Sequence, residues 1–163
     1  MISVVRNDDR LVHGQCMTRI VQHFQLKHII VIDDATYGNS ILKLCVEKAA
    51  MGDYKIECFN STNFVEPLKA ALNDKLSTMV VFRFPPIAKL VYDAVKGEGL
   101  PKELMVGPCQ VTEGAKEVNT GAFVSKEYAE VFNYLLDTYG VETYFQPVPD
   151  MKRVDWKNIK SQF

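Results

Sequence analysis

Short runs of β-branched and other apolar residues alternate with amphipathic segments through most of this chain. The runs expected to form strands are 2–5, 28–32, 55–59, 78–82, 104–106 and 141–145. Several of them are apolar at every position, as strands are when helices cover both faces of a parallel sheet. The alternation therefore predicts an α/β fold with a mainly parallel central sheet flanked by helices on both faces.

Apolar residues at helical spacing occupy the segments between these strands. From Gly14 to Phe24, apolar residues recur at spacings of three and four, which places them on one face of a helix. The other stripes are Ile41, Leu44 and Cys45; Val65, Leu68 and Leu72; Ile87, Leu90, Val91 and Ala94; and Ala129, Phe132 and Leu136. Each stripe predicts a helix that packs on the sheet.

Capping residues mark the expected ends of these helices. Ser61 or Thr62 is expected to cap the helix that follows, and Ser125 is expected to cap the last long helix. Gly97 and Gly140 are placed to end helices, because glycine accepts the left-handed conformation common at a helix C-terminus.

In two segments the apolar residues follow no single helical or strand spacing. Residues 107–121 are rich in proline, glycine and threonine, and we expect a loop or a short hairpin there. Residues 148–163 contain the single tryptophan, Trp156, and are expected to form a terminal helix packed across the body. No internal repeat or linker divides the chain, so residues 1–163 are predicted to form a single domain.

Composition narrows the class of function. The 163 residues are 47% hydrophobic and 24% charged, which fits one ordinary core. The net charge is −1, with no basic cluster for a nucleic-acid backbone, so no nucleic-acid partner is predicted. No apolar run approaches the roughly 18 residues of a membrane span, and Arg6 precedes any signal-like stretch. These features predict a cytoplasmic protein.

The cysteines are far apart in the sequence. They form no C-x-x-C pair and have no histidine at zinc-finger spacing: Cys16, Cys45, Cys58 and Cys109. We therefore predict four reduced thiols, mostly buried, with no metal site and no other cofactor.

The most polar turn of the chain directly follows the first strand. Residues 6–15 read RNDDRLVHGQ. They lie where open α/β sheets bind ligands, at the carboxyl end of a strand beside a helix N-terminus. The helix would present unpaired N–H groups to an anion, and Gly14 would let a phosphoryl group approach the backbone. Arg10 adds a fork of donors suited to phosphate oxygens.

His13 is the predicted nucleophile of this turn. An imidazole with a pKa near 6.5 is largely neutral at cell pH, so a ring nitrogen can attack phosphorus without a separate base. Asp8 and Asp9 would repel a phosphate that they faced, so they are expected to hold Arg6, Arg10 or the loop backbone. The residues thus predict a phosphohistidine loop after the first strand.

The same turn carries a family resemblance. Residues 6–15 resemble the R-I-D-D-R-L-I-H-G-Q signature of the enzyme IIB component of mannose, fructose and sorbose family sugar phosphotransferase systems (PTS), with differences at Asn7 and Val12. The later strands and turns follow the family's order over nearly the whole chain. Family members often have tryptophan at Ile20, a glycine pair where this chain has Gly107 and Pro108, and acidic residues at Gly38 and Asn39.

The resemblance implies a sugar phosphotransferase with a phosphohistidine intermediate, of the protein-N(pi)-phosphohistidine–sugar class. His13 would accept a phosphoryl group from enzyme IIA, with family precedent favouring Nδ1, and pass it to a sugar imported through the membrane components IIC and IID. Arg10, with Gly14 and Gln15, would bind the phosphoryl group, and Arg6 would support them. The protein would associate peripherally with the inner face of the membrane through this permease, as a monomer or a homo-oligomer.

Other readings compete with this one. A histidine phosphatase would have arginine directly before the histidine, whereas Leu11 and Val12 lie between Arg10 and His13 here. Such an enzyme also needs a second catalytic histidine, and neither His23 nor His28 has a suitable setting. These two histidines are expected to serve packing or to place charge at a helix C-terminus. A dinucleotide site would need a glycine-rich first turn. A non-catalytic regulatory or interaction domain of the same fold remains the alternative. Arg83, at the end of a predicted strand, either reaches the histidine loop or is an ordinary strand-end charge.

Overall fold

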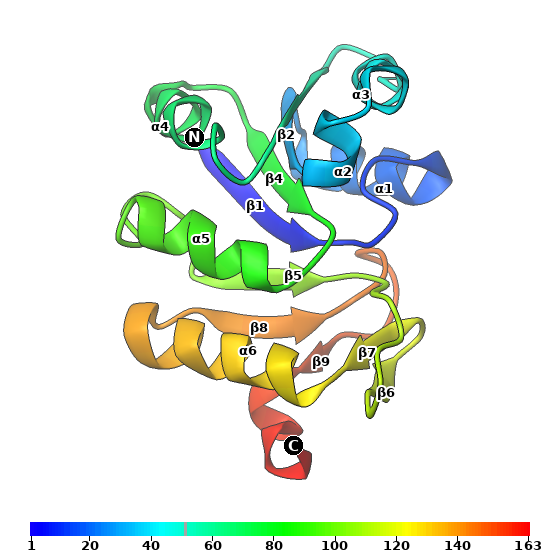
Figure 1. Cartoon of the computed structure of the whole chain (residues 1–163), viewed down its shortest axis with the longest axis vertical. Coiled ribbons are helices and arrows are strands. Elements are labelled where there is room, and N and C mark those ends of the chain that lie inside the picture. Colours follow the sequence, from blue (N-terminus) through cyan, green and yellow to red (C-terminus); the bar gives the residue numbers. More distant parts are fainter. Residues whose placement is uncertain (51) are drawn as a thin grey trace.

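The computed structural model describes residues 1–50 and 52–163, with all of their side chains except those of Gln15 and Cys16. In this part of the chain a seven-stranded sheet has the order β3-β2-β4-β1-β5-β8-β9 (Figure 1). Its strands are β1 (Ile2–Asn7), β2 (His28–Ile32), β3 (Lys55–Phe59), β4 (Thr78–Phe82), β5 (Glu103–Val106), β8 (Glu142–Phe145) and β9 (Val154–Asp155). All neighbours pair in parallel except β9, which runs antiparallel to β8.

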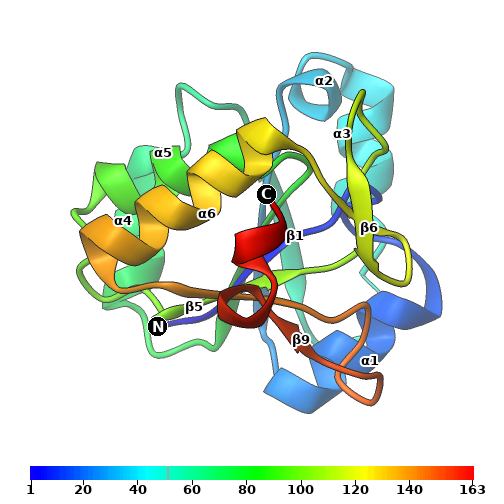
Figure 2. The same ribbon diagram turned by 90° about the horizontal axis from the view of Figure 1, so that it is seen from below.

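Helices cover both faces of the sheet (Figure 2). They are α1 (Gly14–Phe24), α2 (Asp34–Tyr37), α3 (Ser40–Glu47), α4 (Val65–Asn73), α5 (Pro86–Ala94) and α6 (Lys126–Tyr139). Because successive strand residues point to opposite faces, Ile29 and Val31 of β2 pack in the core beneath α1, whereas Ile30 and Ile32 pack in the core beneath α4, α5 and α6. The predicted α/β fold is confirmed.

Strand β1 lies at the topological switch point of the sheet, where the order in which strands are added changes from one side of β1 to the other. The chain adds β2, β3 and β4 on one side of β1 and then crosses β1 to form β5 on the other side. In open α/β sheets the loops at such a switch point form the ligand-binding crevice at the carboxyl ends of the strands. Here those loops begin at Asp8, Arg83 and Gly107.

Most local predictions agree with the structure. Three strands, β2, β3 and β4, and helix α1 have the predicted bounds. The Ser125 side chain accepts a hydrogen bond from the Tyr128 N–H and caps α6, and Gly140 ends that helix in the left-handed conformation. Within 107–121 the predicted hairpin begins with β6 (Lys116–Asn119), which pairs with β7 (Ala122–Val124).

The predicted cap of α4 is wrong. Phe64 occupies the N-cap position, and neither Ser61 nor Thr62 caps the helix. The physical reason is an earlier turn, in which the Asn60 side-chain oxygen accepts hydrogen bonds from the N–H groups of Thr62 and Asn63. Local side-chain bonds of this kind compete with helix capping.

The predicted terminal helix is replaced by shorter elements. After β9 the chain forms two single-turn 3-10 helices, η1 (Trp156–Asn158) and η2 (Lys160–Gln162). Trp156 is buried, and its Nε1–H donates to the side-chain oxygen of Asn133 on α6. Pairing of β9 with β8 and burial of this indole fix the segment before a longer helix can form.

The stripe on α3 forms a helix but does not face the core. Ile41 and Leu44 are 72% and 56% exposed, and Cys45 is also exposed. The face of α3 that contacts the sheet is instead the one that carries Val46 and Glu47. Val46 packs against the core, and the Glu47 carboxylate accepts a hydrogen bond from the Cys58 N–H. The short helix α2, which the sequence pattern did not predict, directly precedes α3.

The cysteines that the structure describes are free thiols. Cys58 and Cys109 are buried, and burial raises the pKa of each thiol to about 11. The side chain of Cys16 lies outside the described part. No helix among the described residues is long and apolar enough to cross a membrane.

The cap of α6 gives a direct test of the fold. Ser125→Ala should lower the free energy of unfolding by about 1 kcal/mol, because an N–H group of the first turn loses its acceptor. Urea titration of the wild type and the variant measures this difference. Lys126→Ala, at the exposed next position, removes no cap and should change stability much less.

Candidate functional site

The loop between β1 and α1 is attached to the strands on both sides of β1. The Asp8 N–H donates to the Phe82 carbonyl at 2.9 Å, and the Asp9 N–H donates to the Pro108 carbonyl at 2.9 Å. The loop then turns back on itself, since the Leu11 N–H donates to the Asp8 carbonyl at 3.0 Å and Leu11 has a φ of 55°. Positive φ is unfavourable for leucine, so these bonds hold a conformation that the residue alone would not choose.

A buried ion pair lies beneath this loop. The Arg6 Nη2 donates to Asp8 Oδ2 at 2.8 Å, and the side chains are 0% and 3% exposed. Arg6 also donates to the Pro147 carbonyl at 2.8 Å and the Gln146 carbonyl at 3.3 Å. Arg6 therefore ties β1 to the segment after β8 and has no face toward solvent.

Gly107 makes room for the pair at the end of β5. A Cβ built on Gly107 would overlap the Arg6 guanidinium, lying 2.8 Å from its Cζ and 3.0 Å from Asp8 Oδ2. The guanidinium cannot move aside easily, because it is fully buried and held by three acceptors. Glycine is required here for close packing, with no demand on φ.

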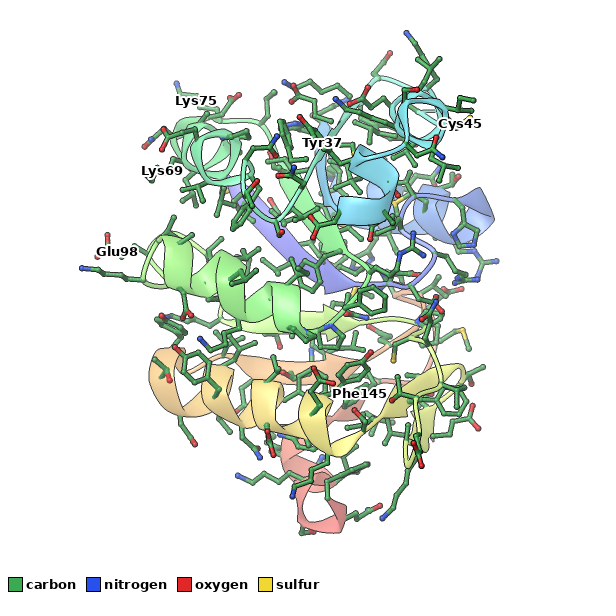
Figure 3. The ribbon with its side chains drawn as sticks, viewed as in Figure 1. Tyr37, Cys45, Lys69, Lys75, Glu98 and Phe145 are labelled. Carbon is green, nitrogen blue, oxygen red and sulfur yellow. The ribbon has the colours of Figure 1, made fainter. Side chains whose placement is uncertain are left out.

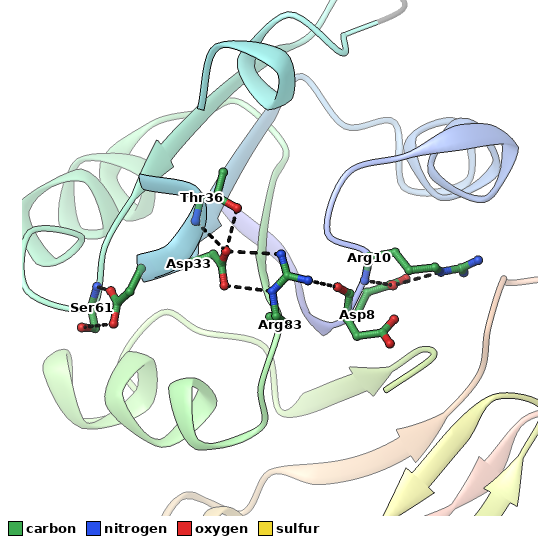
Figure 4. Close-up of polar contacts among 8 residues, drawn as sticks. Asp8, Arg10, Asp33, Thr36, Ser61 and Arg83 are labelled. Atoms are coloured by element: carbon green, nitrogen blue, oxygen red, sulfur yellow. Dashed lines mark hydrogen bonds and ion pairs between the residues drawn. The ribbon is translucent and has the colours of Figure 1, made fainter. Parts of the chain in front are cut away.

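Arg10 is positioned by the other oxygen of the same carboxylate. Its backbone N–H donates to Asp8 Oδ1 at 3.1 Å, and its Nε lies 3.5 Å from that atom. The side chain is 39% exposed and extends away from Arg83 (Figure 4). Among the described residues no other group forms a hydrogen bond or ion pair with the Arg10 guanidinium, so its two terminal nitrogens are available to a ligand.

His13 and Gly14 lead the chain into α1. His13 is exposed, its backbone is extended, and its side chain does not cap the helix. Gly14 has a φ of 58°, and a Cβ built on it would meet no atom of the described side chains or backbone within 4 Å outside its chain neighbours. The first turn of α1 holds no acidic residue. Its N–H groups can therefore bind an anion; the Gln15 backbone belongs to this turn, while its side chain lies outside the described part.

Arg83 reaches the histidine loop from the end of β4. Its Nη1 donates to the Asp9 carbonyl, while its Nε and Nη2 donate to the two oxygens of Asp33 at 3.1 and 3.3 Å (Figure 4). Asp33 also accepts two hydrogen bonds from Thr36, at 2.6 and 2.9 Å. Burial opposes ionisation of Asp33, but the bonds from Arg83 and Thr36 outweigh it and lower the pKa.

The Asp33–Arg83 pair was not predicted. Asp33 directly follows β2, Arg83 directly follows β4, and these two strands are neighbours in the sheet. The signal in the sequence is the position of each charge at a strand end, but only the strand order brings the two together. Of the alternatives for Arg83, the structure shows the contact with the histidine loop.

Asp9 is the electrostatically unfavourable member of the loop. Burial first, and then the neighbouring Asp8 carboxylate, raise its pKa, while Arg10, Arg83 and His13 oppose this increase. Its Oδ1 is buried without a hydrogen-bond partner among the described residues. The three basic groups therefore lie within electrostatic reach of one carboxylate, which places them around a common site.

The other histidines lie away from this site. His28 begins β2 at the amino edge of the sheet, where it is buried and its Nε2 lies 2.7 Å from Glu57 Oε2. Burial and the nearby Lys55 lower the pKa of His28. His23 is in the last turn of α1, roughly 13 Å along the helix from its start. Neither provides the second histidine of a phosphatase.

The two aspartates of the loop should affect stability in opposite directions. Asp8→Asn should destabilise the protein by about 3 kcal/mol at pH 7, because it leaves a buried guanidinium unpaired. Asp9→Asn should raise the melting temperature at pH 7, because the folded state disfavours ionised Asp9. That gain should disappear as the pH falls below about 4, where the unfolded chain is protonated too. Thermal unfolding between pH 3 and pH 7 measures both effects.

Gly107→Ala should destabilise the protein by about 2 kcal/mol, the middle of the range for overpacking a well-packed core. Denaturant unfolding measures this loss. Gly114→Ala is an informative contrast, because a Cβ there meets no atom within 4 Å and its cost comes from the positive φ of 72° alone. A stability of Gly107→Ala equal to wild type would contradict the packing role of Gly107.

Comparison with known proteins identifies the family. The family model for the PTS system sorbose subfamily IIB component matches residues 2–162. The sorbose-specific EIIB component of Lacticaseibacillus casei is 27% identical over 83% of this chain and 80% of that protein. The fructose-specific EIIB component of Bacillus subtilis is 22% identical over 97% of this chain and 94% of that protein.

The fold agrees with the same assignment. The crystal structure of manxB from Thermoanaerobacter tengcongensis is similar with a TM-score of 0.82 and 26% identity, over 100% of this chain and 96% of that one. The match of the family model extends over both faces of the sheet and includes the loop from Asp8 to His13. The chain therefore belongs to the sorbose-subfamily IIB components of the PTS sugar phosphotransferase systems.

Proposed function

We propose that this IIB component is a phosphocarrier in which His13 accepts a phosphoryl group from phosphorylated enzyme IIA and passes it to a sugar entering through the IIC and IID membrane components. The observation that carries the proposal is the exposed His13 at the N-terminus of α1, three residues after an Arg10 held by Asp8. The family assignment supports the general role in sugar phosphotransfer.

The transfer needs little rearrangement at His13. The lone pair of one ring nitrogen forms a bond to phosphorus while the bond to the donor nitrogen breaks and its electron pair returns to the donor. In the second half, a sugar hydroxyl oxygen forms the bond to phosphorus, the ring nitrogen regains its lone pair, and the hydroxyl proton is released. The transition state is loose, so alignment and stabilisation of three oxygens are what the protein must supply.

Some residues around His13 bind the phosphoryl oxygens, and others support the loop. Arg10 offers two guanidinium nitrogens that bind no described residue, and the Gly14 and Gln15 N–H groups lie in the first turn of α1. Together they bind phosphoryl oxygens on the side away from Asp8. Arg6, Asp8 and Asp9 support the loop and make no contact with the phosphoryl group.

The setting of the protein follows from the same proposal. The reaction is placed in the cytoplasm, at the inner face of the membrane where IIC and IID import the sugar. The protein is held there by contact with these components. It functions as the single domain 1–163, and no cofactor takes part in the two transfers.

Phosphorylation of His13 is tested by intact mass. The protein is incubated with phosphoenolpyruvate, the general phosphotransferase proteins and IIA proteins of this family. The wild type should gain one phosphoryl group that is lost in acid, and His13→Ala should gain none. His23→Ala is the matched control and should be labelled like wild type. The 15N chemical shifts of the phosphorylated imidazole then identify the modified nitrogen.

Arg10 variants test the oxygen-binding role. Arg10→Ala should be labelled about 100-fold more slowly than wild type, the scale observed when one donor to a developing oxyanion is removed. Arg10→Lys should recover part of the rate. If an IIA protein binds the wild type but never transfers phosphate, the chain is instead a regulatory or interaction domain.

A further inference from the structure

The charges around the histidine loop already balance one another. Three arginines and three aspartates surround it: Arg6, Arg10, Arg83, Asp8, Asp9 and Asp33. The terminal nitrogens of Arg6 and the whole guanidinium of Arg83 already donate to carboxylates and carbonyls. A phosphoryl group adds roughly two negative charges, so the site needs a further cation when it is loaded.

A cavity beside His13 shows where such a cation comes from. The cavity has a volume of about 370 Å³ and lies between the start of α1 and the end of α3. Its lining on the α1 side includes His13, Gly14 and Thr18. Lys48 and Ala49, which follow α3, form the opposite side. One basic side chain from outside the histidine loop thus shares a cavity with the proposed nucleophile.

The ammonium group of Lys48 is uncommitted. Its backbone N–H donates to the Leu44 carbonyl at 2.9 Å, which fixes the start of the side chain. Among the described residues its Nζ has no hydrogen bond or ion pair. Lys43 on the same helix differs, since its Nζ lies 3.6 Å from Glu47 and 4.8 Å from the centre of the Tyr37 ring.

We propose that Lys48 is a phosphate-binding residue of this site, whose ammonium contacts phosphoryl oxygens while the group is transferred to or from His13. The inference rests on the proposed function of His13. It adds a cation from the residue that follows α3, across the cavity from the first turn of α1. A flexible four-carbon stem suits a contact that forms only when the anion is present.

An ordinary structural role for Lys48 makes a different prediction. A lysine at the C-terminus of a helix interacts favourably with the helix dipole. That role would lower the stability of a neutral variant by a small amount and would leave the transfer rate unchanged. Rate and melting temperature therefore separate the two roles.

A small phosphoryl donor tests the contact without a protein partner. Phosphoramidate transfers its phosphoryl group to imidazole: the phosphorus–nitrogen bond of the donor breaks, ammonia leaves with the electron pair, and the ring nitrogen bonds to phosphorus as the imidazole becomes cationic. The rate of labelling is followed by intact mass in the wild type, Lys48→Gln, Lys48→Ala and Lys48→Arg, and the labelling of His13→Ala is subtracted so that only the phosphoryl group on His13 is counted. Lys75→Gln, in the segment that follows α4 and away from α3, controls for loss of one positive charge (Figure 3).

We expect Lys48→Gln and Lys48→Ala to be labelled at least tenfold more slowly than wild type, with unchanged melting temperatures. Lys48→Arg should recover much of the rate, and Lys75→Gln should equal wild type. The same order should hold with phosphorylated IIA as the donor.

Three outcomes would overturn the proposal. Equal labelling of Lys48→Gln and Lys75→Gln would show that the ammonium does not bind the phosphoryl group. Slowing with phosphorylated IIA but not with phosphoramidate would assign Lys48 to protein docking. Failure of wild type to be labelled at His13 by either donor would remove the proposed function itself, and this result is distinct from the first two.

Discussion

The buried pair of Arg6 and Asp8 is the interaction on which the site depends. Removing two charges from water is costly, and well-packed apolar residues could stabilise the same volume at least as well. The pair instead fixes positions: Arg6 binds the carbonyls after β8, while Asp8 binds the backbone and Nε of Arg10. A single carboxylate thus sets the distance between the core of the sheet and the exposed arginine of the loop.

The histidine turn is so polar because its charges have separate tasks. Arg6 is buried and supports the loop, Arg10 is exposed and has terminal nitrogens that no described residue binds, and Arg83 comes from the end of β4 and donates to the Asp9 carbonyl. The ionised form of Asp9 is destabilised in the folded protein, since burial and the Asp8 carboxylate raise its pKa. A turn built only for reversal would need none of these groups, and their concentration beside an exposed His13 is what the proposed phosphoryl site requires.

Local patterns in the sequence predicted the parts of the fold that local forces decide. The apolar runs gave β2, β3 and β4, the helical stripe gave α1, and Ser125 gave the cap of α6. The Asp33–Arg83 pair and the cavity at Lys48 depend on which strands and helices become neighbours, and no spacing in the sequence encodes that. The exposed side of α3 was misassigned for a related reason: periodicity identifies a helix, but tertiary packing decides which of its faces is covered.

The contacts around β5 explain how this chain departs from the family pattern without losing the loop geometry. The first residue of the expected glycine pair, Gly107, is retained, and any side chain there would overlap Arg6. The second is Pro108, whose carbonyl accepts the Asp9 N–H. Proline lacks an N–H but keeps its carbonyl, so the substitution preserves this bond. Asn39 stands where the family resemblance leads us to expect an acidic residue, and it caps α3 through its side-chain oxygen. In both places the hydrogen bond depends on one oxygen atom, and the residue present supplies that atom.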